Sequence, residues 1–234
     1  MRRRMLASIG GATWKNPYVT DGLVAMWDGE WNVSGGVHDQ NAVSWRDVVG
    51  GEILSPYVSV RPTVGSNSVT VPEGTFLSTR EAFADIAASR ECTIEIVAQF
   101  FQADESAQFA VHIGLPSVTS IPTLGMLCQW VKWGWSNVGV VYNTNDGFSS
   151  GLNSSSCVYG GDLLQTYYNG DFRSVIGCYS QVAAGGHLIL GDVAWGSPAR
   201  QAITYHCVRI YDRAISNFDV AVNYAIDKAR FGLP

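Results

Sequence analysis

Residues 167–172 read Tyr-Tyr-Asn-Gly-Asp-Phe and carry the strongest local structural signal in the sequence. The Asn-Gly pair tolerates positive φ at both central positions of a type I′ turn, and this turn matches the twist of two paired strands. Aromatic residues on both sides of the pair favour strands. The six residues therefore predict a β-hairpin, and the chain continues the same pattern on either side of it.

A second stretch, residues 92–101 (CTIEIVAQFF), predicts a strand because its isoleucines alternate with polar residues. Clusters of glycine, asparagine, serine and proline separate the remaining strand candidates, and such spacing is typical of an antiparallel sandwich or barrel. These candidates are residues 23–27, 109–113, 127–133, 138–142, 163–168, 172–178, 188–190 and 205–211. Residues 147–151 match the G-x-S-x-G nucleophile elbow, but their polar flanks, which include residues 153–156, predict a loop.

Two helices are predicted beside these strands. The first is a short helix at residues 80–89. The second begins near Ser216, whose hydroxyl can cap free backbone N–H groups, and it ends at Gly232 and Pro234. Apolar side chains recur at helical spacing in this segment and predict its buried face, formed by Phe218, Val222, Ala225 or Ile226, and Ala229.

Length and composition exclude several classes of protein. The chain has 234 residues, of which 47% are hydrophobic and 15% charged, so it is not a disordered chain. It holds no apolar run long enough for a membrane span. A net charge of −5 argues against nucleic acid as a partner. We expect one domain over residues 21–234, preceded by an N-terminal arm at residues 1–20.

The predicted arm carries a basic cluster, Arg2, Arg3 and Arg4. The apolar stretch that follows is too short for a signal peptide, so we expect an unprocessed arm. It is interpreted either as a docking arm for an acidic partner surface or as a solvated terminus. The chain has five cysteines without a C-x-x-C pair, which predicts reduced thiols and folding inside a cell.

Three tryptophans give the sharpest signal for ligand binding. Trp130, Trp133 and Trp135 crowd into the segment LCQWVKWGW. In a strand, Trp133 and Trp135 share one face and Trp130 lies on the other. Exposed rings of this kind can stack on sugars, while neighbouring polar side chains supply hydrogen bonds. The alternative is that these tryptophans fill the core, as is expected of Trp27, Trp31 and Trp45.

Signals for metal binding and catalysis are weak. A calcium ion could bind where Asn143, Asn145 and Asp146 converge, although the same residues suit an ordinary turn. The four histidines lack metal-ligand spacing and are expected to have structural or surface roles. Glu95 is the one carboxylate in a clearly predicted strand, and no paired-carboxylate or phosphate-loop motif accompanies it. The sequence therefore predicts a protein that is not an enzyme.

Several further segments occur in a specific order along the chain. Residues 21–27 (DGLVAMW) come first, followed by 44–47 (SWRD) with Gly50 and Gly51, then 92–95 (CTIE) and 167–171 (YYNGD). Residues 208–216 (VRIYDRAIS) then precede Asn223, Tyr224 and Asp227. In this order the segments resemble the laminin-G-like, concanavalin A-like jelly-roll family, whose closing strand ends in an R-x-Y-x-R-x-L-S turn. Here Ile215 stands in place of the usual leucine.

The resemblance implies an all-β, antiparallel two-sheet jelly-roll sandwich that serves as a glycan-binding or protein-contact module, often with a calcium ion at its rim. The basic start and the IDKARFG ending are similar to small jelly-roll virion proteins of tailed phages that infect gut bacteria. Three functions follow as expectations. The first is a phage virion component (capsid decoration or fibre, with homo-oligomers plausible) that assembles in the host cytoplasm and touches host glycans. The second is an extracellular bacterial carbohydrate-binding module, and the third is a jelly-roll glycosidase or lyase.

Overall fold

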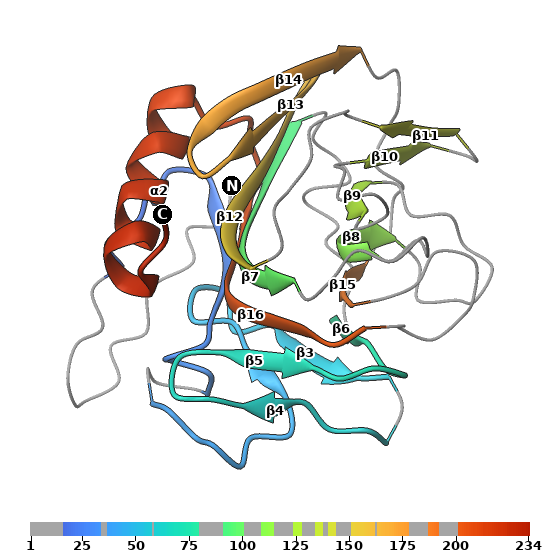
Figure 1. The fold of residues 1–234 in the computed structure, drawn as a ribbon, viewed down its shortest axis with the longest axis vertical. Coiled ribbons are helices and arrows are strands. Elements are labelled where there is room, and N and C mark those ends of the chain that lie inside the picture. The colour runs from blue at the N-terminus through green and yellow to red at the C-terminus, as the bar shows by residue number, and fades with distance from the viewer. Residues whose placement is uncertain are drawn as a thin grey trace.

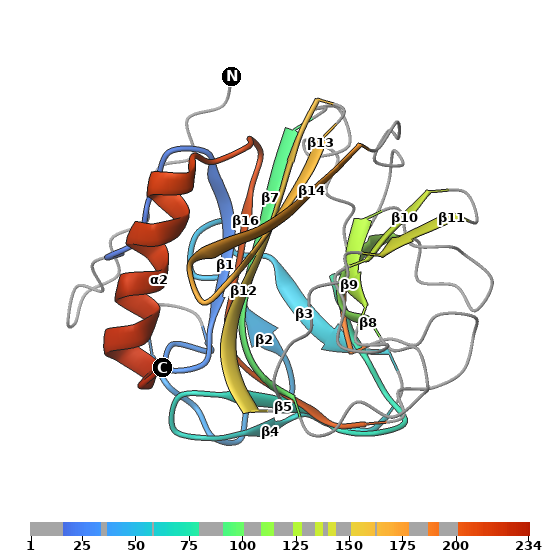
Figure 2. The ribbon, with the colours of Figure 1, turned by 45° about the horizontal axis from the view of Figure 1, so that its top comes forward.

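The computed structural model describes residues 16–33, 37–57, 59–79, 91–100, 109–114, 124–127, 134–137, 140–143, 151–161, 163–177, 187–191 and 201–234. These residues form two antiparallel eight-stranded sheets and one helix, α2 (Asn217–Phe231). Helix α2 lies on the outer side of one sheet, and the other sheet lies on the far side of that sheet (Figures 1 and 2). The prediction of an all-β, two-sheet jelly-roll sandwich with a C-terminal helix is confirmed. The predicted helix at residues 80–89 lies outside the described residues.

We call the sheet that carries α2 the helix-side sheet and the other the distal sheet. The helix-side sheet runs in the order β14 (Asp171–Gly177), β13 (Leu163–Tyr168), β12 (Gly151–Gly160), β7 (Glu91–Phe100), β16 (Ile203–Tyr211), β5 (Val69–Val71) and β4 (Thr63–Val64), and β1 (Leu23–Asp28) also pairs with β16. The distal sheet runs in the order β11 (Val140–Asn143), β10 (Gly134–Asn137), β9 (Leu124–Leu127), β8 (Phe109–Gly114), β15 (His187–Leu190), β6 (Leu77–Thr79), β3 (Ile53–Pro56) and β2 (Trp45–Arg46).

The main core fills the space between the two sheets. Strand β7 shows how alternation builds it, because Ile94 and Ile96 point into this core while Glu95 points toward α2. Of the three predicted core tryptophans, Trp27 and Trp45 are fully buried in the same cluster, whereas Trp31 is only partly buried and lies outside it. The three cysteines among the described residues, Cys92, Cys157 and Cys207, are buried thiols that form no disulfide, as predicted.

The predicted Tyr167–Phe172 hairpin forms as expected. Asn169 has φ 48° and Gly170 has φ 78°, the positive values that a type I′ turn requires. Asn169 also ties the turn to β12, because its side-chain Oδ1 accepts the backbone N–H of Ser154 at 3.0 Å. A Cβ at Gly170 would come within 2.5 Å of the Tyr224 ring. The hairpin turn therefore packs directly on α2.

The prediction of a loop around residues 147–156 is wrong for residues 151–156. Residues 151–160 form β12, a ten-residue strand that pairs along its whole length with β7. Its polar segment, residues 153–156, is buried. A polar strand is stable here because its side chains have partners: Ser156 donates to Glu95 at 3.2 Å, and Ser154 donates to Asp227 at 3.4 Å.

The ends of α2 lie where the sequence predicts, but its buried face differs. Ser216 accepts the backbone N–H of Asp219 as the N-cap, and Gly232 ends the helix with φ 70°. Phe218, expected to be buried, is 76% exposed. The fully buried side chains are instead Val220, Asn223 and Asp227, while Ile226, which the sequence predicted on this face, is partly buried and packs on a core cluster. The sheet presents charged groups to this face, so polar residues occupy it.

We expect Gly170→Ala to destabilise the protein by about 2 kcal/mol or more, because the new Cβ adds a clash with Tyr224 to the strain of positive φ. Gly161→Ala is the matched control, since Gly161 has φ 66° and no atom lies within 4 Å of the place that a Cβ would take, and it should cost only about 1 kcal/mol. Urea denaturation measures both values. Equal losses would mean that the turn does not pack on the helix.

Candidate functional site

A buried charge network joins α2 to the helix-side sheet. Arg209 of β16 donates from Nη1 and Nη2 to the two carboxylate oxygens of Asp227, at 2.7 and 2.6 Å. Its Nε donates to Glu95 Oε2 at 2.8 Å. All three side chains are at most 1% exposed. Such bidentate, charge-assisted bonds fix the helix in one position on the sheet.

Neutral side chains complete this network. Asn223 Nδ2 donates to Glu95 at 2.7 Å and to the Tyr211 hydroxyl at 2.9 Å. Burial raises the pKa of Glu95 above its usual range, while the Arg209 charge opposes that shift. The Arg209 guanidinium thus lies beneath the helix between the carboxylates of Glu95 and Asp227 and pairs with both. We assign this network a structural role, because a substrate cannot reach groups that the helix covers.

The segment before β1 is fastened to the same network. The Tyr18 ring lies 4.1 Å from the guanidinium carbon of Arg209, and its hydroxyl accepts from Arg230 at 2.9 Å. The backbone N–H of Val19 donates to Asn223 Oδ1 at 3.0 Å. Residues 16–20, the last part of the predicted arm, therefore pack on the sandwich beside α2.

Asp47 organises the turn of the SWRD segment. Its carboxylate accepts backbone N–H groups from Met26, Val49 and Gly50 at 2.6–2.8 Å, and from Glu52 at 3.4 Å. Burial raises the pKa of Asp47, and these four donors oppose the shift. The carboxylate therefore serves to hold a loop against β1.

The residues predicted to bind ligands or partners lie largely outside the described part of the chain. Trp135 is in β10 opposite Tyr142, and Asn143 ends β11 opposite Gly134, so the hairpin brings these two positions close together. The remaining predicted positions, Arg2, Arg3, Arg4, Trp130, Trp133, Asn145 and Asp146, lie outside the described residues. Within the described ranges, no group of three or more histidine, cysteine, aspartate or glutamate residues could hold a metal ion.

The histidines show why a buried imidazole need not be a ligand. His112 of β8 is 3% exposed, and burial lowers its pKa to about 3. It is therefore neutral at physiological pH. Burial also lowers the pKa of His206. Both observations agree with the structural roles expected for these two residues.

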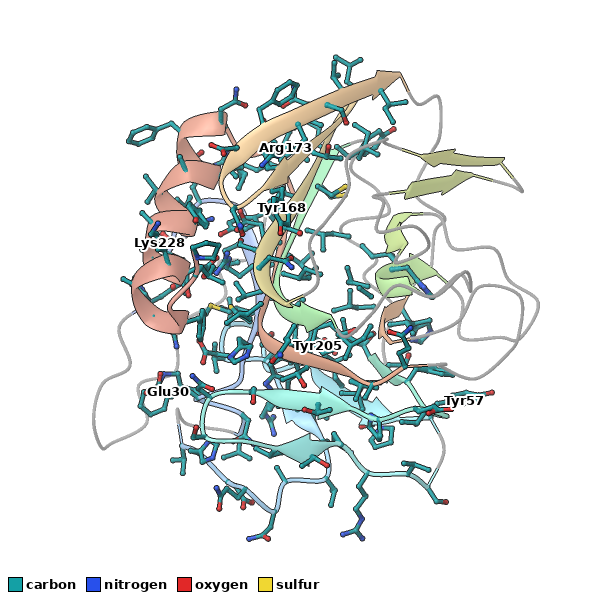
Figure 3. The ribbon with its side chains drawn as sticks, viewed as in Figure 1. Glu30, Tyr57, Tyr168, Arg173, Tyr205 and Lys228 are labelled. Carbon is teal, nitrogen blue, oxygen red and sulfur yellow. The ribbon has the colours of Figure 1, made fainter. Side chains whose placement is uncertain are left out.

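Exposed apolar side chains lie on β14, the edge strand of the helix-side sheet, and on its neighbour β13. Phe172 and Val175 of β14 are 51% and 52% exposed, and Leu163 of β13 is 48% exposed. The first turn of α2 adjoins this surface, because Tyr167, which packs edge-on against Phe172, donates its hydroxyl hydrogen to Asn217. We call Leu163, Phe172 and Val175 the apolar edge. Figure 3 labels Tyr168 and Arg173 on the same two strands.

Sequence comparison finds no matching protein-family model and no matching curated protein. Solved structures share the fold. Trypanosoma rangeli sialidase in complex with 2,3-difluorosialic acid superposes with a TM-score of 0.68 at 14% identity, over 97% of this chain and 36% of that chain. The botulinum neurotoxin serotype D binding domain gives a TM-score of 0.66 at 10% identity, over 90% of this chain and 53% of that chain.

A third structure, the receptor binding domain of a botulinum neurotoxin C/D mosaic serotype, gives a TM-score of 0.63 at 9% identity, over 89% of this chain and 52% of that chain. The chain thus spans about a third of the sialidase chain and about half of each toxin domain. These similarities support the β-sandwich fold. The laminin-G-like and phage resemblances stay predictions. Among the described residues, no helix has the length and apolar character to cross a membrane.

We expect Asp227→Asn to lower the free energy of unfolding by about 3 kcal/mol, because it removes a charge that pairs with the buried Arg209 guanidinium. Arg213→Met is the control, since Arg213 pairs with Asp21 and Asp219 nearer the surface and should cost about 1 kcal/mol or less. Chemical denaturation compares the two variants. A loss as small for Asp227→Asn as for the control would contradict an anchoring role for the network.

Stability should fall on acidification because of His112. Its pKa is 6.5 in an ordinary setting and about 3 in the fold, so between these values the unfolded chain binds the extra proton. The stability that neutral His112 contributes is complete above pH 6.5 and declines toward pH 3, by up to about 1.4 kcal/mol per pH unit. The free energy of unfolding, measured by chemical denaturation at several pH values across this window, should depend less on pH for His112→Gln than for the unmodified protein. The same pH dependence of the free energy of unfolding in the two proteins would contradict the prediction.

Proposed function

We propose that this chain is a non-catalytic binding module that joins a larger assembly through its surface. The apolar edge carries the proposal. Large apolar side chains exposed together on a soluble protein are characteristic of contact sites, and an edge strand adds backbone groups that another chain can pair with. The two charged residues of the edge strand β14, Asp171 and Arg173, pair with each other at 3.9 Å.

The absence of catalysis is part of the proposal and rests on how the buried acids are used. Glu95 and Asp227 are covered by α2 and bridged by Arg209. The other two buried acids of the described residues are also occupied, Asp28 by Arg230 at 2.7 Å and Asp47 by backbone donors. A glycosidase needs two carboxylates that face an accessible cleft. The glycosidase or lyase alternative would therefore have to place its acids elsewhere in the chain.

The finer proposal is a virion component of a tailed phage, either a capsid decoration or part of a fibre, assembled in the host cytoplasm. The features behind it are the basic cluster Arg2, Arg3 and Arg4, which would anchor the chain, and the compact sandwich that would face outward. Neighbouring genes for capsid or tail proteins would support this assignment. Neighbouring genes for polysaccharide degradation would favour the extracellular bacterial carbohydrate-binding module.

Contact with glycans is the second candidate function. The observation that favours it is the aromatic ring of Tyr57, which is 57% exposed and stacked on Phe76. The same fold also occurs in structures described as a sialidase in complex with sialic acid and as a receptor binding domain. Binding to a host glycan is compatible with attachment to a particle, because the Tyr57 ring and the apolar edge lie on different sheets.

Docking through the apolar edge predicts that Val175→Lys weakens co-sedimentation of the purified chain with phage particles assembled without it, by about tenfold or more. The reason is that the contact would bury an unpaired charge. Val43→Lys is the control, since Val43 is 46% exposed in the segment between β1 and β2.

Two outcomes would count against this proposal. Unchanged co-sedimentation of Val175→Lys would remove the apolar edge as the contact. If the unmodified chain binds no particle, and is absent from particles that were produced in cells expressing it, the virion assignment is wrong.

A further inference from the structure

An aromatic pair extends the distal sheet beyond the ends of its strands. In the β3–β6 ladder Ser55 pairs with Ser78 and Pro56 with Leu77. The same register places Tyr57 opposite Phe76, and the backbone N–H of Tyr57 donates to the Phe76 carbonyl oxygen at 3.0 Å. The two rings stack with centroids 4.4 Å apart and an angle of 18° between their planes. The pair is therefore held by both its backbone and its rings.

Alternation along these strands shows which way the pair faces. Leu54 and Leu77 belong to the core between the sheets. Side chains on a strand alternate between its two faces, so Ser55 and Ser78 lie on the opposite, outer face. Tyr57 and Phe76 follow these serines by the same two-residue step. The aromatic pair thus stands on the outer face of the distal sheet, next to two serines.

The exposure of Tyr57 defines the free surface of the ring. Phe76 covers one face of the Tyr57 ring, yet the residue remains 57% exposed. The exposed part therefore includes the opposite ring face. Figure 3 shows Tyr57 at the periphery of the molecule, with its side chain directed outward. A ring that is fixed from behind and open in front loses little conformational freedom when a ligand stacks on it.

We propose that this pair is a stacking platform for a neutral pyranose ring, with Tyr57 as the contact surface and Phe76 as its support. The proposal rests on the glycan contact proposed above and gives it a location. The C–H face of a sugar suits the negative face of an aromatic ring. The hydroxyl of Ser55, roughly 6–7 Å along the strand, is a polar group that could orient the sugar, whereas the Ser78 hydroxyl is buried and donates to the Thr79 carbonyl oxygen at 3.1 Å.

The charge of the protein selects among ligands that stack on aromatic rings. Nucleotides and sialylated glycans are anionic, whereas the chain carries a net charge of −5. Close by in the sequence, the exposed charges of Glu73, three residues before Phe76, and Arg61, four residues after Tyr57, offset each other, so the net charge of the chain decides the electrostatics. A neutral sugar meets no such repulsion, so neutral glycans are the class assigned to this platform.

Saturation-transfer NMR on the full chain with cellotriose, chitotriose and lactose as probes tests the platform. We expect at least one of these sugars to bind at millimolar concentration. Tyr57→Ala should weaken that binding by about tenfold or more, and Tyr57→Trp should retain it because the stacking surface is kept. Phe76→Leu should weaken it by removing the support. Phe218→Ala removes a still more exposed ring on α2 and should change nothing.

The outcomes separate the platform from the wider proposal. Loss of binding in Tyr57→Ala but not in Phe218→Ala, with thermal unfolding unchanged, would support the platform. Equal binding by Tyr57→Ala and the unmodified chain would overturn the platform and leave a glycan site elsewhere. If none of the three sugars binds the unmodified chain, both the platform and the proposed contact with neutral glycans are wrong, whereas docking through the apolar edge is unaffected.

Discussion

The pairing of Arg209 with Asp227 is the interaction on which the helix side of the molecule depends. The Arg209 guanidinium beneath α2 bonds both to Asp227 of the helix and to Glu95 of β7, and all three side chains are at most 1% exposed to bulk solvent. A buried charge without its partner costs several kcal/mol, so the helix has one favourable position on the sheet. Tyr18 stacks on the same guanidinium, which extends this constraint to the segment before β1.

The network also explains two departures from simple patterning. Strand β12 is polar over residues 153–156, and the inward face of α2 carries Asn223 and Asp227. Each of these features alone would be unfavourable inside a protein, because buried polar groups need partners. Together they satisfy one another across the interface. The cost of burial is thereby offset, and the geometry of the interface becomes specific rather than merely apolar.

This arrangement leaves particular surfaces of the sandwich for contacts. Helix α2 occupies the outer face of the helix-side sheet (Figure 2). Its first turn contacts β13 through the hydrogen bond from Tyr167 to Asn217, next to the exposed apolar edge. The distal sheet carries the Tyr57–Phe76 pair beside β3 and β6, toward the β2 end of its strand order. Under the proposed function, these two separate surfaces would let the module attach to a particle and contact a second partner at the same time.

The sequence by itself determined the features that depend on neighbouring residues. The Asn169–Gly170 turn, the alternation in β7 and the caps Ser216 and Gly232 could be predicted because backbone conformation is set locally. Only the tertiary structure decided which polar residues are buried and which aromatic residues are exposed. Residues 153–156 form a strand because Glu95 and Asp227 lie opposite them, and Phe218 is exposed because Arg209 requires a polar helix face. Tyr57 and Phe76 meet through strand register, which depends on residues far apart in the chain.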